Sequence, residues 1–281
     1  MLRRMMMTGA AGGGLWTPLN LAVLPKVLAD DQSSITTDSG KCTKWNDRSG
    51  AGVHMSNDFS SLSPAVVGSG LNGLRTLSFN GSNTYLRNGS TAGVDIFRNT
   101  GAGWGFCVFK RAATDGSAID RHLMMASNNA TGTTRFIMSS GRVTGANKLS
   151  LTVRRLDSDS TASMLSAASG GTAWTMIYMP MDWANGDGFI YTDGALTDSN
   201  TSLTSNGVTS NTAANDALVF GAASNAAGGF FNGEMAAMVL GSGSLPSAGE
   251  IDKLFGYYAH RYALTGNLDS GHPYKTTPPN I

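Results

Sequence analysis

The sequence predicts an all-β fold, either a sandwich or a barrel. The chain of 281 residues contains 36 glycines, and glycine favours short strands joined by turns over long helices. Turn-forming residues recur roughly every eight to twelve positions, which is the spacing of strands in sandwiches and barrels. Only one segment, near the end of the chain, has the pattern of a helix. Hydrophobic residues make up 41% of the sequence, enough to fill one large β domain or two small ones.

The first half of the chain contains several strand-like regions. Residues 35–45 read as a strand that a Ser-Gly turn interrupts. Residues 74–86 supply further apolar positions, and Asn80-Gly81 within them is typical of a two-residue hairpin. Residues 104–112 begin as a nearly continuous apolar run. This run predicts a strand that is buried on both faces at its start and has its far end in water.

The second half continues the same pattern of short apolar runs separated by glycine and asparagine. These runs are HLMMASN (122–128), TTRFIMSSGRV (133–143), KLSLTVRRL (148–156), TAWTMIYMPMDW (172–183), GDGFIYTDGALTD (186–198) and DALVFGAAS (216–224). We expect each of them to contribute strands to the same domain.

The single predicted helix begins at Ser247. Glu250 follows three residues later, the spacing at which a serine and a glutamate cap the first turn of a helix. Apolar residues then recur at helical spacing and predict one buried stripe, made of Ile251, Leu254, Phe255, Tyr258 and Tyr262. Lys253, His260 and Arg261 are expected to face solvent, and Gly266 to end the helix.

Four segments in the same order resemble a known family. They are KWNDRSGAG (44–52), GLNGLRTLSFNGSNTYL (70–86), FIYTDGALTD (189–198) and FNGEMAAMVLGSGSLPSAGEIDKLFGYYAHRYAL (231–264). Together they resemble the concanavalin A-like lectin/glucanase domain, in the laminin-G-like variety found in bacterial surface proteins and bacteriophage virion proteins. The resemblance implies a two-sheet antiparallel β-sandwich, a jelly roll, with one short C-terminal helix. It leaves glycan binding, glycan cleavage and structural contacts open as functions.

The chain is divided into three parts by composition and by this resemblance. Residues 1–30 are predicted to be an N-terminal arm that docks on a partner, residues 31–266 the laminin-G-like sandwich, and residues 267–281 a Pro-containing tail. The arm is rich in Met and Gly and too broken for a signal peptide or a membrane span. Within it, Met5, Met6, Met7 and Trp16 are the expected docking residues, because methionine makes adaptable contacts.

The sequence lacks the residues that the enzymes of this superfamily use. Glycoside hydrolysis needs paired carboxylates, and Glu234 and Glu250 are the only glutamates and do not form the E-x-D-x-x-E motif of the related glucanases. The histidines lie far from any nucleophile-elbow motif; they are His54, His122, His260 and His272. We therefore predict a protein that is not an enzyme and has no catalytic residues.

A loop around Trp183 is the predicted glycan-binding site. A tryptophan in a Gly/Asn/Asp loop offers an aromatic platform beside hydrogen-bonding groups, here Asp182 and Asn185. Packing of Trp183 in its turn is the alternative, and the tryptophans at 45, 104 and 174 are assigned to the core. No cofactor is predicted. Calcium is kept as an alternative at Asp182, Asn185 and Asp187, or at Asn215 and Asp216, although these residue types also occupy ordinary turns.

The net charge and the cysteine content limit which partners and which covalent links are expected. A net charge of +1 gives no global attraction to nucleic acid or to anionic membranes, so neither is expected as a partner. Cys42 and Cys107 are the only cysteines, and their separation leaves open whether they form a bridge.

The function predicted first is that of a non-enzymatic structural protein of a phage particle, a capsid decoration or tail-associated component. It would act through contacts with other virion proteins, assemble in the host cytoplasm and form a homo-oligomer. The alternative is a carbohydrate-binding adhesion module that recognises a surface polysaccharide of the host.

Overall fold

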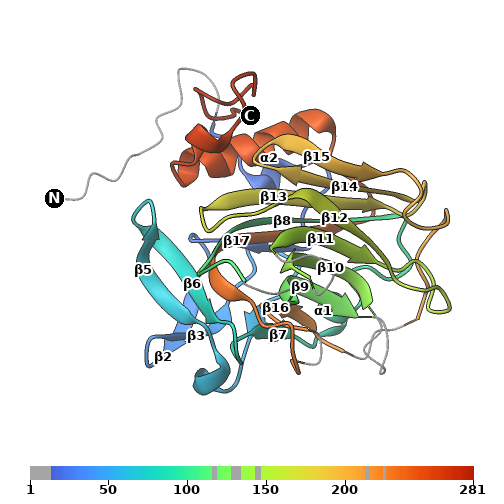
Figure 1. Ribbon diagram of the computed structural model, residues 1–281. Coiled ribbons are helices and arrows are strands. Elements are labelled where there is room, and N and C mark those ends of the chain that lie inside the picture. The colour runs from blue at the N-terminus through green and yellow to red at the C-terminus, as the bar shows by residue number, and fades with distance from the viewer. Residues whose placement is uncertain (1–13, 116–118, 128–133, 143–146, 213–215, 224–225) are drawn as a thin grey trace.

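The computed structural model describes residues 14–281 except 116–118, 128–133, 143–146, 213–215 and 224–225, and shows an all-β protein with one long helix (Figure 1). The strands are β1 (Val27–Ala29), β2 (Ile35–Asp38), β3 (Lys41–Trp45), β4 (Met55–Ser56), β5 (Ala65–Leu71), β6 (Leu74–Asn80), β7 (Leu86–Asn88), β8 (Ala102–Arg111), β9 (Arg121–Ser127), β10 (Thr134–Gly141), β11 (Lys148–Val153), β12 (Ala162–Ser169), β13 (Thr175–Asp182), β14 (Asp187–Thr192), β15 (Ala195–Asn200), β16 (Leu218–Phe220) and β17 (Asn232–Ser242). The α-helices are α1 (Thr91–Val94) and α2 (Ala248–Arg261), and short 3-10 turns lie at Pro18–Asn20, Ser60–Leu62 and Thr265–Asn267. The all-β prediction with one C-terminal helix is confirmed.

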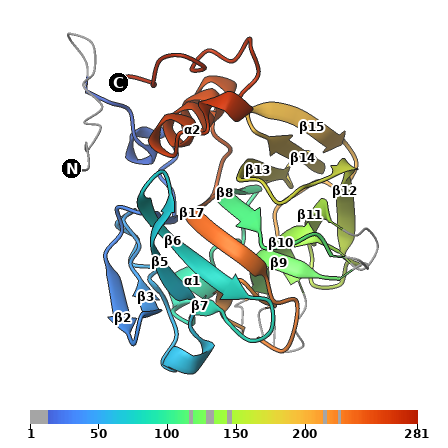
Figure 2. The same cartoon turned by 60° about the vertical axis from the view of Figure 1, so that its left-hand side comes forward.

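The strands pair antiparallel in two series. One series runs β15-β14-β13-β8-β17. The second edge of β17 is shared by β6 and β1, and β5 lies beyond β6 (Figure 2). The other series runs β2-β3-β4-β7-β16-β9-β10-β11-β12. A bridge between Lys41 and Ala65 joins the series into one continuous sheet, of 17 strands in the described part of the chain, so the division into two separate sheets stays a prediction.

One apolar core brings the two series together. It combines side chains of β3, β10 and β11 with side chains of β8, β13 and β17, among them Trp45, Phe136, Leu151, Phe109, Met179 and Met238. Strand β8 is buried on both faces, as predicted: Cys107 and Phe109 enter this core, while Phe106 and Val108 face the opposite side. Its far end is not in water, however, because Arg111 is only 3% exposed.

Helix α2 covers the outer face of the β17-β8-β13 part of the sheet (Figure 1). Ser247 and Glu250 cap it as predicted: the backbone N–H of Ser247 donates to the Glu250 carboxylate over 2.9 Å and the Ser247 hydroxyl over 2.7 Å. The ring of Tyr258 stacks on Phe106 with centroids 5.0 Å apart, and Phe255 meets the same ring edge-on at 5.2 Å. The predicted apolar stripe is therefore the face that attaches the helix to the sheet.

His260 and Arg261, which were expected on the solvent-exposed face of α2, have protein partners instead. His260 shares a 2.9 Å hydrogen bond between its Nε2 and the carbonyl of Tyr274, and Arg261 forms an ion pair with Asp31. Asp31 also accepts a 3.0 Å hydrogen bond from the hydroxyl of Tyr262. The sequence could not show these contacts, because their partners lie in distant segments of the chain.

Asp30 and Asp31 form the centre of a buried polar network under the helix. Asp30 is fully buried, and the Arg48 guanidinium donates to both of its carboxylate oxygens at 2.8 and 2.9 Å. Burial raises the pKa of Asp30, and the charge of Arg48 opposes that rise. Because Asp31 holds Arg261 of α2, this network ties the segment before β2 to the helix near the end of the chain.

Residues 14–30 pack on the rest of the described chain. Trp16 is 2% exposed, its ring lies edge-on to Tyr257 of α2 with centroids 6.2 Å apart, and its backbone N–H donates to the carbonyl of Pro279. Strand β1 pairs with β17 in the sheet. Trp16 therefore packs on its own chain, and the division of the chain at residue 30 stays a prediction. The other predicted docking residues, Met5, Met6 and Met7, lie outside the described residues.

The tail also packs against the domain beside α2 (Figures 1 and 2). Leu268 is buried in the cluster under the helix, and Asn280 forms a β-bridge with Leu15.

The Asn80-Gly81 pair does not form the predicted hairpin. Strand β6 pairs with β5 and β17, while β7 pairs with β4 and β16. The carboxamide oxygen of Asn80 instead accepts backbone N–H groups of the turn that follows, including that of Ser82 at 2.9 Å. Two-residue hairpins occur at Asn72-Gly73 and Asp193-Gly194, where both residues have positive φ, as a type I′ turn requires.

Both cysteines are free thiols in the core. Cys42 and Cys107 are fully buried, and burial raises the pKa of Cys42 to about 12. Among the described residues, no helix has the length and the hydropathy needed to span a membrane.

Candidate functional site

Trp183 is not the exposed platform that the sequence predicts. It is completely buried, with its ring 6.0 Å from that of Phe97 and 6.2 Å from that of Phe136. The chain turns back into the core immediately after β13, so the residue following Asp182 points inward. A buried indole cannot stack on a glycan, so the prediction of an exposed Trp183 is wrong.

The two residues assigned beside Trp183 form the turn itself. Asp182 accepts hydrogen bonds from the backbone N–H of Asn185 at 3.2 Å and from its side-chain amide at 2.8 Å. These are local turn contacts of the kind that aspartate and asparagine commonly make. In the part of the chain that the structure describes, no group of three or more His, Cys, Asp or Glu side chains is placed to hold a metal ion. Asn215, named with Asp216 for calcium, lies outside that part.

The glutamates are occupied by structural partners. Glu234 pairs with Lys110 at 2.9 Å and accepts a 2.6 Å hydrogen bond from the hydroxyl of Thr76. Glu250 accepts a 2.7 Å hydrogen bond from the backbone N–H of Ala22 in addition to capping α2.

A serine and a histidine do meet, but inside the fold. The Nδ1 of His122 lies 2.9 Å from the Oγ of Ser139, and the two residues are 5% and 0% exposed. A nucleophile must reach its substrate, and neither side chain reaches the surface. The pair therefore has a structural role.

The buried His122 makes the fold sensitive to acid. Burial lowers the pKa of His122 to about 4 from 6.5, with Asp120 opposing the shift and Arg142 adding to it. Because the folded state keeps the ring neutral, the stability it contributes is complete above pH 6.5 and is lost as the pH falls from 6.5 to about 4. The loss amounts to about 3 kcal/mol in the free energy of unfolding. We expect urea unfolding of His122→Gln to depend less on pH over this range than unfolding of the wild type; equal slopes would contradict the assignment.

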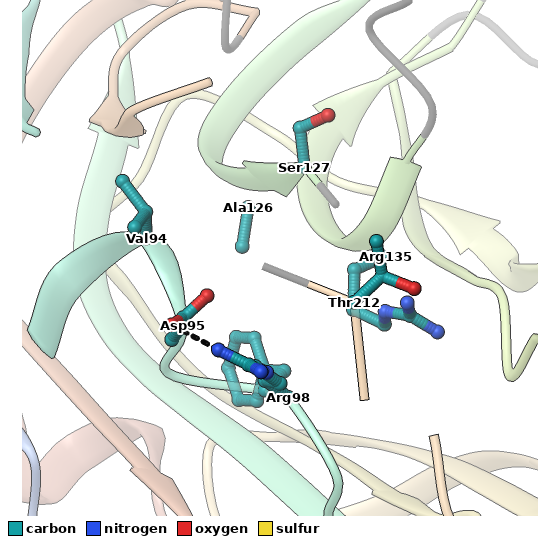
Figure 3. A pocket seen from close by; sticks show the side chains of 8 residues that line it. Val94, Asp95, Arg98, Ala126, Ser127, Arg135 and Thr212 are labelled. Atoms are coloured by element: carbon teal, nitrogen blue, oxygen red, sulfur yellow. Dashed lines mark hydrogen bonds and ion pairs between the residues drawn. The ribbon is translucent and has the colours of Figure 1, made fainter. Parts of the chain in front are cut away.

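A small hollow in the surface lies between α1 and β10 (Figure 3). The 3.0 Å ion pair of Asp95 with Arg98 lies on its wall, and Arg135 lies on another side. Its free volume is about 10 Å³. That space holds about one water molecule, so it is not a ligand site.

A wider groove of about 540 Å³ lies on the other side of the same ion pair. Lys26, Thr91 and Ser242 contribute its polar groups, and Val53 and Ile96 contribute apolar surface. Arg98 is held by Asp95 and by the carbonyl of Asn211 at 3.0 Å. The described residues include several buried polar side-chain atoms that lack a hydrogen-bond partner. None of these atoms belongs to a residue that lines this groove.

The third hollow is a cavity of about 350 Å³ between the two strand series. Its walls come from the end of β8, from β11 and β12, from the start of β13 and from the β14-β15 hairpin. The lining residues are Phe109, Arg111, Leu149, Ser166, Ala167, Gly170, Gly171, Thr175, Thr192, Asp193, Thr197 and Asp198. The cavity thus combines an apolar part with hydroxyls, carboxylates and a guanidinium.

Two polar atoms of this cavity lack partners. The Oδ1 of Asp198 accepts a 3.0 Å hydrogen bond from the backbone N–H of Ala167, but its Oδ2 has none among the described residues. The Nε of Arg111 is also buried without a partner in that part of the chain. Burial lowers the pKa of Arg111 to about 10, and the charge of Asp115 opposes that shift. Both atoms belong to residues that line one cavity, but each exposes less than 1 Å² of surface, so neither is offered to a ligand.

Asp193, Ser166 and three threonines supply the other polar side chains. Burial raises the pKa of Asp193 to about 6, although its carboxylate accepts a 2.9 Å hydrogen bond from the backbone N–H of Met176. The hydroxyls of Thr192 and Thr197 lie 3.3 Å apart. Carboxylates accept hydrogen bonds and hydroxyls both donate and accept them, so these side chains can pair with the polar groups of a ligand.

Sequence reasoning missed this cavity. The segment YTDGALTD, around Asp193 and Asp198, does cluster these polar residues, but it reads as an ordinary hairpin. Its partners Arg111 and Leu149 come from strands far away in the sequence.

Comparison with known proteins gives a fold and no family. No family model matches the chain, and no curated protein matches it. Among solved structures, the binding domain of Paraclostridial Mosquitocidal Protein 1 matches with a TM-score of 0.54 and 14% identity, over 84% of this chain and 53% of that one. The receptor binding domain of the botulinum neurotoxin C/D mosaic serotype matches with a TM-score of 0.52 and 11% identity, over 83% and 51%. That of botulinum neurotoxin type G matches with 0.51 and 14%, over 85% and 51%. This chain therefore spans about half the length of each of these bacterial toxin domains and has the fold of that half.

Proposed function

We propose that this protein is a carbohydrate-binding module that holds a saccharide in the cavity between β8, β12 and the β14-β15 hairpin. The observation that carries the proposal is the composition of the walls, which combine hydroxyls and carboxylates with the apolar side chains of Phe109 and Leu149. A saccharide has hydroxyl groups at its rim and C–H groups on its faces, so it complements both kinds of surface. The module acts by binding, and no catalytic residues are assigned.

The size of the cavity and the polar groups that line it support the same function. A cavity of about 350 Å³ lies at the lower end of the range for small-molecule sites, about 300–1,000 Å³. A sugar hydroxyl both donates and accepts hydrogen bonds, so it can pair with the hydroxyls of Thr192 and Thr197 and with the Asp193 carboxylate. The fold is one on which known toxins build binding domains, which is compatible with this role.

Asp198→Ala is expected to weaken saccharide binding about tenfold or more, because it removes a charged side chain from the wall together with the hydrogen bond that holds the backbone of Ala167, another lining residue. A glycan array identifies the ligand, and titration calorimetry then compares the affinities. Asp38→Ala is the matched control, since Asp38 is exposed on β2, away from the cavity. Thermal unfolding establishes that both variants fold. A blank array with folded wild-type protein, or equal affinities in the two variants, contradicts the proposal.

The strand pairing also supports the finer fold predicted from sequence. We propose a laminin-G-like sandwich in which the two strand series are the two sheets and the Lys41–Ala65 bridge is a local contact at one edge. The shared core between the series is the feature expected of such a sandwich.

The structural role in a phage particle stays a prediction. Its expected docking residue Trp16 is covered by the protein's own helix, which removes one of the surfaces proposed for virion contacts. The two roles are compatible, because a component of a particle can also attach to host glycans. Mass spectrometry of purified virions tests the structural role, which predicts that this protein is found in the particles.

A further inference from the structure

Asp193 offers the cavity a carboxylate oxygen that is open to solvent. The residue lies in the turn between β14 and β15 and lines the cavity. Its Oδ1 accepts the backbone N–H of Met176 at 2.9 Å and the side-chain amide of Asn267 at 3.5 Å. Its Oδ2 accepts no hydrogen bond from the described residues, yet it is not one of their fully buried unpaired atoms. The Asp193 Oδ2 is therefore accessible, unlike the unpaired atoms of Arg111 and Asp198.

Three threonines line the same cavity with their hydroxyl hydrogens already engaged. The Thr175 hydroxyl donates to the carbonyl of Ala173 at 3.3 Å, and the Thr197 hydroxyl donates to the carbonyl of Ile190 at 3.0 Å. Because the Thr197 hydrogen is engaged, Thr192 is the donor in the 3.3 Å contact between the hydroxyls of Thr192 and Thr197. A hydroxyl whose hydrogen is engaged still accepts hydrogen bonds. All three side chains are partly or largely exposed, so they offer a ligand acceptors.

The cations beside the cavity are directed at backbone carbonyls. Arg111 is 3% exposed, and its Nη1 donates to the carbonyl of Gly171 at 3.3 Å. The ammonium of Lys148 donates to the carbonyl of Ala167 at 2.9 Å. A ligand in the cavity therefore meets hydrogen-bond acceptors and the negative charge of Asp193 more directly than it meets either cation.

We infer that Asp193 determines the class of saccharide: the site takes a sugar without an acidic group, and a hydroxyl of that sugar donates to the Asp193 carboxylate. This inference rests on the proposed function. A uronic acid fits less well, because its ionised carboxylate donates no hydrogen bond and carries the same sign of charge as Asp193.

Titration calorimetry on the wild-type protein tests the preference without any variant. The probes are glucose, galactose and mannose, each compared with its own uronic acid, from which it differs at one carbon. We expect the neutral sugar that binds to do so at least about tenfold more tightly than its acid. Equal or tighter binding of the acid overturns the inference and leaves the proposed function standing. Binding of none of these sugars also overturns the inference, and the glycan array then decides the proposed function separately.

Asp193→Asn assigns the preference to its residue. Asparagine tolerates the positive φ of 51° at this position, and its carbonyl oxygen can still accept the N–H of Met176, so the turn is kept. The variant removes the charge and replaces one acceptor oxygen by a donor. We expect the ratio of neutral-sugar to acid affinity to fall at least about tenfold. Asp38→Asn makes the same change on exposed β2 and should leave the ratio unchanged. An unchanged ratio in folded Asp193→Asn overturns the assignment.

The pH dependence of the ratio is a second readout for Asp193. Burial raises the pKa of Asp193 to about 6. Acidification from about pH 7.5 to about pH 5 therefore neutralises Asp193, while the uronic acids stay ionised. We expect the wild-type ratio to fall over this range and the ratio of Asp193→Asn to stay constant. Circular dichroism checks that both proteins are folded at both pH values.

The variant also separates Asp193 from its charged and titratable neighbours. These line the cavity or lie on the segments packed around the turn, and they are Arg111, Lys148, Asp198, Asp252, His272 and Lys275. All of them are present in both proteins, so any pH effect of theirs appears in both. A wild-type ratio that does not change with pH, or the same change in Asp193→Asn, overturns the role of Asp193.

Discussion

Trp183→Ala is expected to lower the free energy of unfolding by about 3–5 kcal/mol, the cost of removing a large aromatic side chain from a packed core. The indole is fully buried and packs against Phe97 and Phe136. Gly103 of β8 makes room for it, since a Cβ there would lie 2.8 Å from the ring. Its Nε1 has no hydrogen-bond partner among the described residues, so the cost is one of packing and cavity formation. Urea unfolding followed by circular dichroism measures the change.

Trp174→Ala is the matched control for this substitution. Trp174 is only partly buried, and the ammonium of Lys110 lies 5.0 Å from the centre of its ring. We expect it to cost about 1 kcal/mol, within the range of ordinary substitutions. If Trp183→Ala unfolds at the same urea concentration as Trp174→Ala, the buried placement of Trp183 is wrong. If Trp183→Ala also lost glycan binding, the loss would follow from its lower stability and would not show that Trp183 contacts the glycan.

Asp31→Ala is expected to cost about 3–5 kcal/mol, because it removes one partner of a buried ion pair. Asp31 is 9% exposed, and its carboxylate accepts hydrogen bonds from the Arg261 Nε at 2.7 Å and from the Tyr262 hydroxyl at 3.0 Å. The variant leaves the guanidinium under α2 without its charge partner. Urea unfolding of the full chain measures the loss of stability.

A double-mutant cycle separates the ion pair from other effects of Asp31→Ala. Combining it with Arg261→Ala should cost much less than the sum of the two single changes, because the two residues share one interaction. The exposed Asp38→Ala serves again as the matched control and should change stability by no more than about 0.5 kcal/mol. Additive effects of Asp31→Ala and Arg261→Ala would contradict the role given to the pair.

Local sequence signals predicted the parts of the fold that depend on neighbouring residues. The helix start at Ser247 and Glu250 is an example, since its hydrogen bonds join residues only three positions apart. The apolar stripe of α2 follows from spacing in the same way. The Asn80-Gly81 prediction failed because an Asn-Gly pair favours positive φ but does not specify which strands pair on either side of it.

The candidate site could not be predicted, because it depends on distant contacts. Trp183 lies in a loop-like sequence, and its burial is decided by Phe97 and Phe136, which are far from it along the chain. The cavity likewise joins Arg111 of β8 to the hairpin that carries Asp193 and Asp198. A single sequence shows each residue but not this arrangement.

The position of β17 has a consequence for how the chain is made. Strand β17 pairs with β8 along one edge and with β6 and β1 along the other, and all three precede it by more than a hundred residues. Pairing between segments so far apart in sequence closes large loops and is slow. During synthesis the edges of these three strands that pair with β17 stay open, with unpaired N–H and C=O groups, until residues 232–242 have been made. Formation of β17 therefore decides whether these earlier strands fold or aggregate.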